Sequence, residues 1–302
     1  MYLACLRARS DCRWLILSYS SDWLFPPEES RHLVEALVAR GKRVTYCNVE
    51  SPYGHDSFLL EHNLEVYGEL IRAFLANLNG AAAPSQPAGG VRRSWVSVDP
   101  ASIFHPDRLD YDRIIALIPQ GASVLDLGCG HGELLYRLAQ AGFDKLTGVE
   151  LDEKAIVSCV RVGLAVIHAD LNRSLGQFPD GSFDYVVLSQ TLQAVIDVEG
   201  LLAEIVRIGR RAIVTFPNFA FQPLRRMLAE EGRAPESPGL LGRRWFNTPN
   251  LRFFSIRDFE ELCREKGFRV HRRITLDTEA GVEVFQEPNR LADLAIYVVS
   301  RT

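Results

Sequence analysis

The middle of the chain carries glycines and acidic residues at the spacing of a ligand-binding loop. An apolar run predicted to be a buried strand ends at Asp126, and three glycines follow at alternating positions: Gly128, Gly130 and Gly132. Glycines at a strand-to-helix turn let the backbone bend tightly and approach a ligand without a Cβ in the way. Glu150 lies at the end of the next predicted strand, where its carboxylate can accept both hydroxyls of a ribose. These residues predict a site for a nucleoside-containing cofactor.

The order of the glycines distinguishes two such cofactors. A loop that binds NAD reads G-x-G-x-x-G, whereas residues 126–132 read DLGCGHG, with an acid shortly before the first glycine. This pattern resembles motif I of class I methyltransferases, in which the acid and the loop hold the amino-acid end of S-adenosylmethionine. The resemblance implies that Asp170 hydrogen-bonds the adenine amino group, that Leu171 makes a neighbouring contact and that Ser189 borders the methionine moiety. We therefore expect S-adenosylmethionine as the cofactor.

Longer blocks of sequence resemble one family in particular. The MetW family of methionine-biosynthesis proteins is similar to this chain in the blocks VLDLGCGHGELL, DYVVLSQTLQAV, RRAIVTFPNF and WFNTPNLRFFSIRDFEELCRE. The similarity covers roughly the last two thirds of the chain. MetW proteins are associated with homoserine O-acyltransferase, so the resemblance implies that this enzyme is the partner of the chain.

The beginning of the chain resembles a second family. Residues 20–27, SSDWLFPP, and residues 52–58, PYGHDSF, are similar to the C-terminal end of homoserine O-acetyltransferases (MetX), which have the α/β-hydrolase fold. The resemblance implies that Asp22 and His55 are the acid and the base of a Ser-His-Asp triad, in which the imidazole takes a proton from the serine. No G-x-S-x-G nucleophile elbow occurs in the sequence, so we expect no acyltransferase activity from this chain alone. We expect it to be the tail of an acyltransferase–MetW fusion that was started late or split by a frameshift.

Predicted strands and helices alternate on both sides of a segment rich in small residues, proline and glycine. Residues 79–90, NGAAAPSQPAGG, have no apolar periodicity and predict a linker. Before the linker, the pattern predicts a βαβα fragment of an α/β hydrolase, whose two strands should belong to a larger structure. After it, the longer alternation predicts the Rossmann-like doubly wound sheet of class I methyltransferases. The expected domains are an acyltransferase fragment at 1–78, a linker at 79–100 and a MetW-like domain at 101–302.

Composition limits the compartment and the partners. The chain has 34 basic and 38 acidic residues and a net charge of −4, so we expect neither nucleic acid nor an anionic membrane as a partner. The six cysteines are scattered and lack metal-ligand spacing, which favours reduced thiols and no metal. No uncharged run approaches the length of a membrane span, and charges interrupt the apolar start of the chain. We expect a cytoplasmic protein.

The residues leave three functions open. The first is a MetW-type protein that binds S-adenosylmethionine and supports homoserine acylation. The second is an active methyltransferase on an unidentified small molecule, for which the polar residues near the predicted cofactor site are His131, Gln190, Gln193 and Asn218. The third is homoserine O-acetylation by this chain when a separate chain supplies the serine-bearing half.

Overall fold

The computed structural model describes residues 12–60, 64–78, 108–173, 175–235, 245–246 and 248–302. Their contacts divide them into two compact units. The first unit comprises the described residues of Met1–Arg93 and of Gly128–Ser182, and the second comprises those of Ser94–Leu127 and of Phe183–Thr302. The predicted linker at 79–100 lies outside the described residues, so the predicted domain limits remain predictions.

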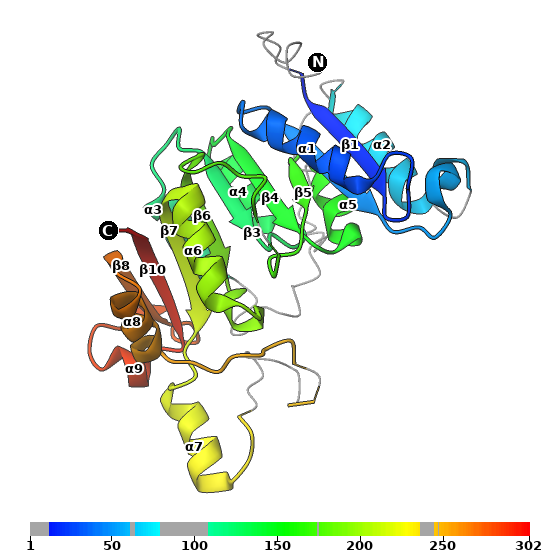
Figure 1. Cartoon of the computed structure of the whole chain (residues 1–302). Coiled ribbons are helices and arrows are strands. Elements are labelled where there is room, and N and C mark those ends of the chain that lie inside the picture. The colour runs from blue at the N-terminus through cyan, green and yellow to red at the C-terminus, as the bar shows by residue number, and fades with distance from the viewer. Residues whose placement is uncertain (1–11, 61–63, 79–107, 174, 236–244, 247) are drawn as a thin grey trace, which may run out of the picture. The chain divides into compact units, whose positions relative to one another are not determined.

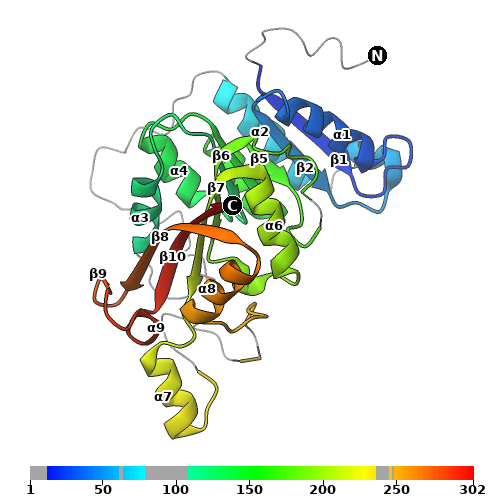
Figure 2. The ribbon, with the colours of Figure 1, turned by 60° about the vertical axis from the view of Figure 1, so that its left-hand side comes forward.

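The first unit contains four parallel strands in the order β1-β2-β5-β4 (Figure 1). Their bounds are Trp14–Tyr19 for β1, Val44–Val49 for β2, Leu146–Glu150 for β4 and Val166–His168 for β5. The helices of this unit are α1 (Pro27–Val38), α2 (Leu64–Leu78), α4 (Glu133–Gln140), α5 (Glu153–Arg161) and a 3-10 helix at Gly54–Leu59. Helices α2 and α5 pack against each other, as two views of the ribbon also show (Figure 1, Figure 2).

Strand pairing joins the N-terminal segment to the strands that follow the glycine loop. Tyr46 of β2 lies opposite Ile167 of β5. Next to this pair, the N–H of Asn48 donates to Nδ1 of His168 at 3.2 Å. Because β5 covers the edge that β2 would otherwise expose, the expectation that the first two strands belong to a larger structure is confirmed.

The second unit contains six strands in the order β3-β6-β7-β10-β8-β9. Their bounds are Val124–Leu127 for β3, Phe183–Ser189 for β6, Gly209–Pro217 for β7, Phe268–Asp277 for β8, Val282–Glu283 for β9 and Leu294–Arg301 for β10. The helices are α3 (Leu109–Leu117), α6 (Val198–Ile208), α7 (Gln222–Glu231), α8 (Ile256–Glu265) and α9 (Pro288–Leu291), and a 3-10 helix covers Leu192–Ala194. Strands β3, β6 and β7 are parallel, whereas β10 runs antiparallel to both β7 and β8.

An aromatic cluster forms the core between α8 and the strands of the second unit. The ring of Phe216 on β7 lies 4.7 Å from that of Phe259 on α8 and 5.8 Å from that of Tyr297 on β10. Helix α8 begins with a capping box, in which Ser255 and Asp258 each accept a hydrogen bond from the other's backbone N–H. The cap fixes the start of the helix, and the apolar face of the helix then covers the strands.

The predicted α/β class is confirmed. The first unit has parallel strands connected by helices, and the second places an antiparallel strand beside β7, as in the class I methyltransferase fold. The N-terminal segment has the predicted βαβα order. Within the residues that the structure describes, no helix is both long enough and apolar enough to cross a membrane.

Replacing Gly132 by alanine should destabilise the first unit. Gly132 has a φ of 83°, and a Cβ there would lie 2.6 Å from Leu164 Cδ1 and 2.8 Å from Cys159 Sγ. We expect Gly132→Ala to lower the free energy of unfolding by about 2–4 kcal/mol, because backbone strain and overpacking add. Gly130→Ala is the matched control, since Gly130 also has a positive φ but a Cβ there would meet no atom within 4 Å. Its loss should be about 1 kcal/mol. Equal losses in denaturant unfolding would contradict the packing role of Gly132.

The half-buried imidazole of His168 on β5 should make stability depend on pH. Burial lowers the pKa of His168 below its ordinary value, so the folded chain binds fewer protons at this group than the unfolded chain. The contribution is therefore complete at neutral pH and is lost as pH falls from the unfolded pKa of about 6.5 toward the folded value. Between about pH 7.5 and about pH 5.5, His168→Gln should lose less free energy of unfolding than the parent chain. A parallel loss in both proteins would contradict this role of the imidazole.

Candidate functional site

The predicted glycine loop folds back against the end of β4 in the first unit. Gly128, Gly130 and Gly132 have φ angles of 71°, 54° and 83°, a region that glycine enters at little steric cost. The N–H groups of Gly128 and Cys129 both donate to the carbonyl of Val149, at 2.9 and 3.0 Å. The three glycines therefore occupy positions whose backbone conformation other residues rarely adopt.

Glu150, the last residue of β4, holds this loop through its carboxylate. Oε2 accepts from the N–H of Gly130 at 2.7 Å, while Oε1 accepts from the N–H groups of Leu151 and Asp152 at 2.7 and 2.9 Å. A carboxylate has about four acceptor positions, so these bonds leave one position on Oε2 for a ligand hydroxyl. A second hydroxyl would have to replace a backbone donor. Because a Cβ at Gly130 would meet no atom within 4 Å, open space lies beside the loop for a ligand.

Asp170 lines a cavity of about 400 Å³ in the same unit. The cavity is also lined by Leu151, which follows Glu150, and by Tyr46 and Asn48 of β2. An adenine fits a cavity of this size, and the carboxylate of Asp170 is an acceptor suited to its amino group. The predicted ribose and adenine acids therefore lie at the ends of adjacent strands, one at the glycine loop and the other in a cavity.

The other contacts of Asp170 keep its carboxylate in a turn after β5. Oδ1 accepts from the N–H and the side-chain amide of Asn172, at 2.9 and 3.1 Å, and Oδ2 lies 3.7 Å from Nε of Arg173. Leu171, predicted to make a neighbouring contact, is half-buried and is not among the residues that line the cavity. The structure therefore brings Asp170, but not Leu171, into the cavity.

The remaining predicted cofactor residues, Asp126 and Ser189, belong to the second unit. Asp126 is buried on β3, where it lies opposite Val187 of β6. Ser189 ends β6, and its Oγ accepts from Nη2 of Arg108 at 2.9 Å. Arg108 in turn makes two 3.0 Å hydrogen bonds to the carboxylate of Asp110. Ser189 is therefore part of a buried ionic network.

This network was not predicted from the sequence. Gln190 joins it by donating from Nε2 to Asp110 at 3.1 Å, and its N–H donates to Oγ1 of Thr215 at 3.0 Å. Gln190 has a φ of 48°, which is unusual for a residue with a side chain. The pattern Arg-x-Asp before a helix is common on protein surfaces, so its only distinguishing property is burial, which one sequence does not reveal. The network positions Ser189 and Gln190 at the carboxyl end of β6.

Asp22 and His55, predicted from the second resemblance, meet in the first unit. Nδ1 of His55 lies 3.0 Å from Oδ2 of Asp22. Oδ1 of Asp22 accepts from the N–H groups of Leu24 and Phe25, each at 2.9 Å. The ring of His55 lies 5.2 Å from that of Phe25. Because Asp22 engages Nδ1, the imidazole has Nε2 left to accept a proton.

The electrostatics of Asp22 suit the role of a triad acid. Burial alone would raise the pKa of Asp22, but the hydrogen bonds from Phe25, His55 and Leu24 outweigh it and lower the pKa below its ordinary value. The carboxylate is therefore ionised at neutral pH and can stabilise a protonated His55. Among the described residues, no serine hydroxyl forms a hydrogen bond with His55, whose side-chain partner is Asp22. The pair is an acid and a base without a nucleophile.

The other polar residues singled out from the sequence have different surroundings. His131 is exposed on the glycine loop. Gln193 is buried and donates to the carbonyl of Gln190 at 2.5 Å. Asn218 is fully buried and donates to the carbonyl of Ala292 at 2.7 Å, so it ties the end of β7 to the segment before β10. In the part of the chain that the structure describes, no three His, Cys, Asp or Glu residues are grouped as metal ligands.

Two known proteins are similar to this chain, one over nearly its whole length and the other over a short part of it. A bifunctional methionine biosynthesis protein MetXA/MetW from Rhodopirellula baltica is 38% identical over 300 residues, which cover 96% of this chain and 45% of that protein. The chain thus spans less than half the length of this relative. A homoserine O-succinyltransferase from Psychrobacter arcticus is 46% identical over 68 residues, which are 22% of this chain and 15% of that enzyme.

A solved structure and a family of known proteins are also similar to this chain. The solved structure of an S-adenosylmethionine dependent methyltransferase from Mesorhizobium loti aligns with a TM-score of 0.49 at 17% identity, over 64% of this chain and 98% of that one. Residues 108–299 match the family described as methionine biosynthesis protein MetW. This match covers more than half of the chain, and the chain therefore belongs to the MetW family.

Proposed function

We propose that the chain binds S-adenosylmethionine and supports a homoserine O-acyltransferase. The observation that carries the cofactor proposal is the 2.7 Å hydrogen bond from Gly130 to Glu150. It holds a loop of positive-φ glycines next to a carboxylate that still has an acceptor position. Membership of the MetW family supports the link to methionine biosynthesis.

Each residue in the proposed cofactor site has a distinct task. Glu150 would accept a ribose hydroxyl, Asp170 would accept the adenine amino group, and the loop at Gly128 to Gly132 would expose backbone to the ligand. Asp126 and Ser189 enter the proposal through the family resemblance. When bound, S-adenosylmethionine would supply an activated methyl group for transfer, or it would act as a ligand that reports methionine supply.

Similar proteins support the proposed partner. One relative carries both functions in its name, as a bifunctional MetXA/MetW protein. The N-terminal segment of this chain is similar to homoserine O-succinyltransferases and pairs with β5 of the first unit. A homoserine O-acyltransferase is thus the enzyme whose activity the chain would support, and the preference for acetyl or succinyl groups belongs to that enzyme.

Binding of S-adenosylmethionine should depend on Glu150. In isothermal titration of the full chain, Glu150→Ala should weaken binding about 10- to 100-fold, because a hydrogen bond to a charged group is lost and the loop loses its tether. Glu265→Ala is the control, since it removes an exposed carboxylate from α8 of the other unit. Unchanged affinity in Glu150→Ala would remove this residue from the proposed site. Donor consumption by the isolated chain in an extract would favour methyl transfer over a supporting role.

The Asp22–His55 pair supports a second proposed function, acyl transfer together with a serine-bearing half. In that reaction the serine Oγ would attack the carbonyl of an acyl thioester while its proton passes to Nε2 of His55, and Asp22 would stabilise the imidazolium. The C–S bond of the thioester would break, and the imidazolium would protonate the departing thiolate. The hydroxyl of homoserine, deprotonated by His55, would then attack the acyl-serine and release the serine, which would take the proton back from the imidazolium. Mixing the chain with the serine-bearing part of a related acyltransferase should therefore produce acylated homoserine.

His55→Ala should lower this complemented activity at least about 10³-fold, because the serine loses its base. His32→Ala, which removes an exposed histidine from α1 of the same segment, should leave the activity unchanged. The measurement is the rate of acylated homoserine formation by the mixture. If the mixture is inactive, or if both variants retain activity, the pair has no catalytic role in this chain.

A further inference from the structure

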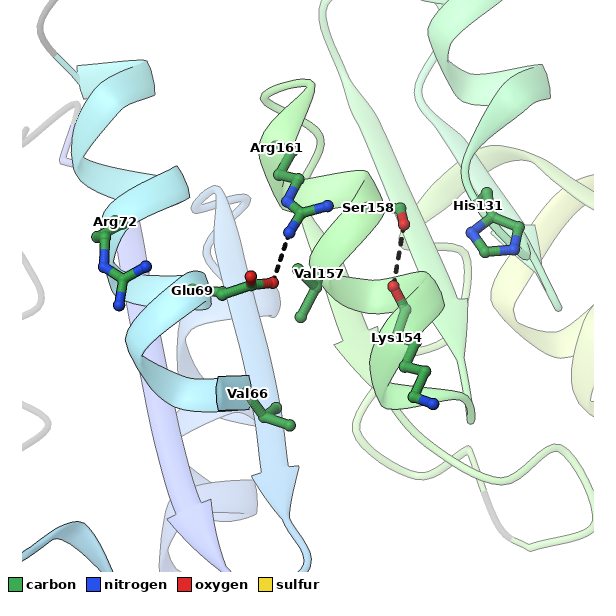
Figure 3. Close-up of a pocket in the computed structure, with 8 residues that line it drawn as sticks. All are labelled: Val66, Glu69, Arg72, His131, Lys154, Val157, Ser158 and Arg161. Carbon is green, nitrogen blue, oxygen red and sulfur yellow. Dashed lines mark hydrogen bonds and ion pairs between the residues drawn. The ribbon is translucent and has the colours of Figure 1, made fainter. Parts of the chain in front are cut away.

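A groove between α2 and α5 carries an unusual set of side chains (Figure 3). It has a volume of about 660 Å³. Its walls are formed mainly by Val66, Glu69 and Arg72 of α2 and by Lys154, Val157 and Arg161 of α5. These positions follow the three- and four-residue spacing of one helix face on each side, and together they line the pocket.

Two contacts set the shape of the groove. Near the C-terminal ends of the helices, Nδ2 of Asn77 donates to the carbonyl of Val160 at 3.0 Å and closes the seam. Within the groove, Nη2 of Arg161 lies 2.5 Å from Oε2 of Glu69, and Figure 3 shows these side chains pointing toward one another. The remainder of the seam stays open, with Val66 and Val157 as its apolar part.

The charges in the groove do not balance. Among the residues whose side chains the structure describes, its walls contain three cationic side chains, Arg72, Lys154 and Arg161, and one carboxylate, that of Glu69. Arg161 forms an ion pair with that carboxylate. Among the described residues, neither Arg72 nor the ammonium group of Lys154 forms an ion pair. A concentration of positive charge in a chain whose net charge is −4 marks this groove as a site for an anion.

We propose that the groove binds a small ligand with more than one phosphate group. Figure 3 shows Arg72 on α2, Arg161 on the side of α5 that faces α2, and Lys154 on α5 with its ammonium group turned away from α2. Because these cations are spread out, a ligand with several phosphate groups can reach more of them than a single phosphate can. Guanidinium groups bind phosphate oxygens in pairs, and an ammonium group adds a compact charge. Val66 and Val157 provide an apolar surface for the rest of the ligand.

This site is separate from the proposed cofactor site. Glu150 and Asp170, the acids proposed to hold the nucleoside, do not line the groove. His131 on the glycine loop does line it, so the two sites adjoin at the loop. Changes to Arg72 and Lys154 should therefore leave the binding of S-adenosylmethionine intact, which gives the experiment an internal check on folding.

Isothermal titration of the full chain with inorganic tripolyphosphate tests the proposal. The parent chain should bind tripolyphosphate more tightly than orthophosphate. The double variant Arg72→Gln with Lys154→Gln should weaken tripolyphosphate binding at least about tenfold, because two direct charge contacts are lost. Arg264→Gln, which removes an exposed arginine from α8 of the other unit, should leave it unchanged.

A variant that binds tripolyphosphate more tightly than the parent chain would distinguish a specific site from a general loss of structure. Glu69→Gln removes the carboxylate that pairs with Arg161 in the described part of the walls, so it should tighten tripolyphosphate binding several-fold. Failure of the parent chain to bind, equal weakening in the double variant and in Arg264→Gln, or weaker binding in Glu69→Gln would each overturn the proposal.

Discussion

The hydrogen bond between the Gly130 amide and the Glu150 carboxylate determines how the first unit can meet a ligand. The carboxylate also accepts from the two backbone amides that follow it, so one side chain fixes both the glycine loop and the turn into α5. The same carboxylate retains one acceptor position. A group that both organises a loop and remains able to bind is preorganised for a ligand, since little ordering is left to be done when the ligand arrives.

One strand pairing and two hydrogen bonds hold the N-terminal segment to the rest of the first unit. Strand β2 pairs with β5, the N–H of Asn48 donates to His168, and the N–H of Glu50 donates to Oε1 of Glu153 at 2.8 Å. Glu50 lies just before the turn that carries His55, and Glu153 lies just after the turn organised by Glu150. The acid–base pair and the proposed cofactor acids therefore share one continuous framework within the first unit. The segment that is similar to homoserine O-succinyltransferases thus pairs with a strand of the sheet that carries the glycine loop.

The sequence predicted the α/β class and the loop because both rest on local signals. Positive φ angles at Gly128, Gly130 and Gly132 are open to residues that lack a side chain, whereas the Asp22–His55 pair was implied by the resemblance to homoserine O-acetyltransferases. Other features depend on contacts between distant residues. The pairing of Tyr46 with Ile167, the Arg108–Asp110 network and the cationic groove between α2 and α5 involve residues whose types are ordinary until the fold brings them together. These contacts exist only in the folded chain.

Backbone hydrogen exchange with and without S-adenosylmethionine shows whether the ligand reaches Glu150 and its glycine loop. Exchange should slow at the amides of residues 128–132 and 150–152, because a ligand on Glu150 would hold the loop and exclude water from it. Protection should also appear around Asp170, where the adenine would lie. Protection confined to other segments, or a loop whose exchange is unaffected at saturating ligand, would contradict the assignment of this carboxylate and its glycines to the cofactor.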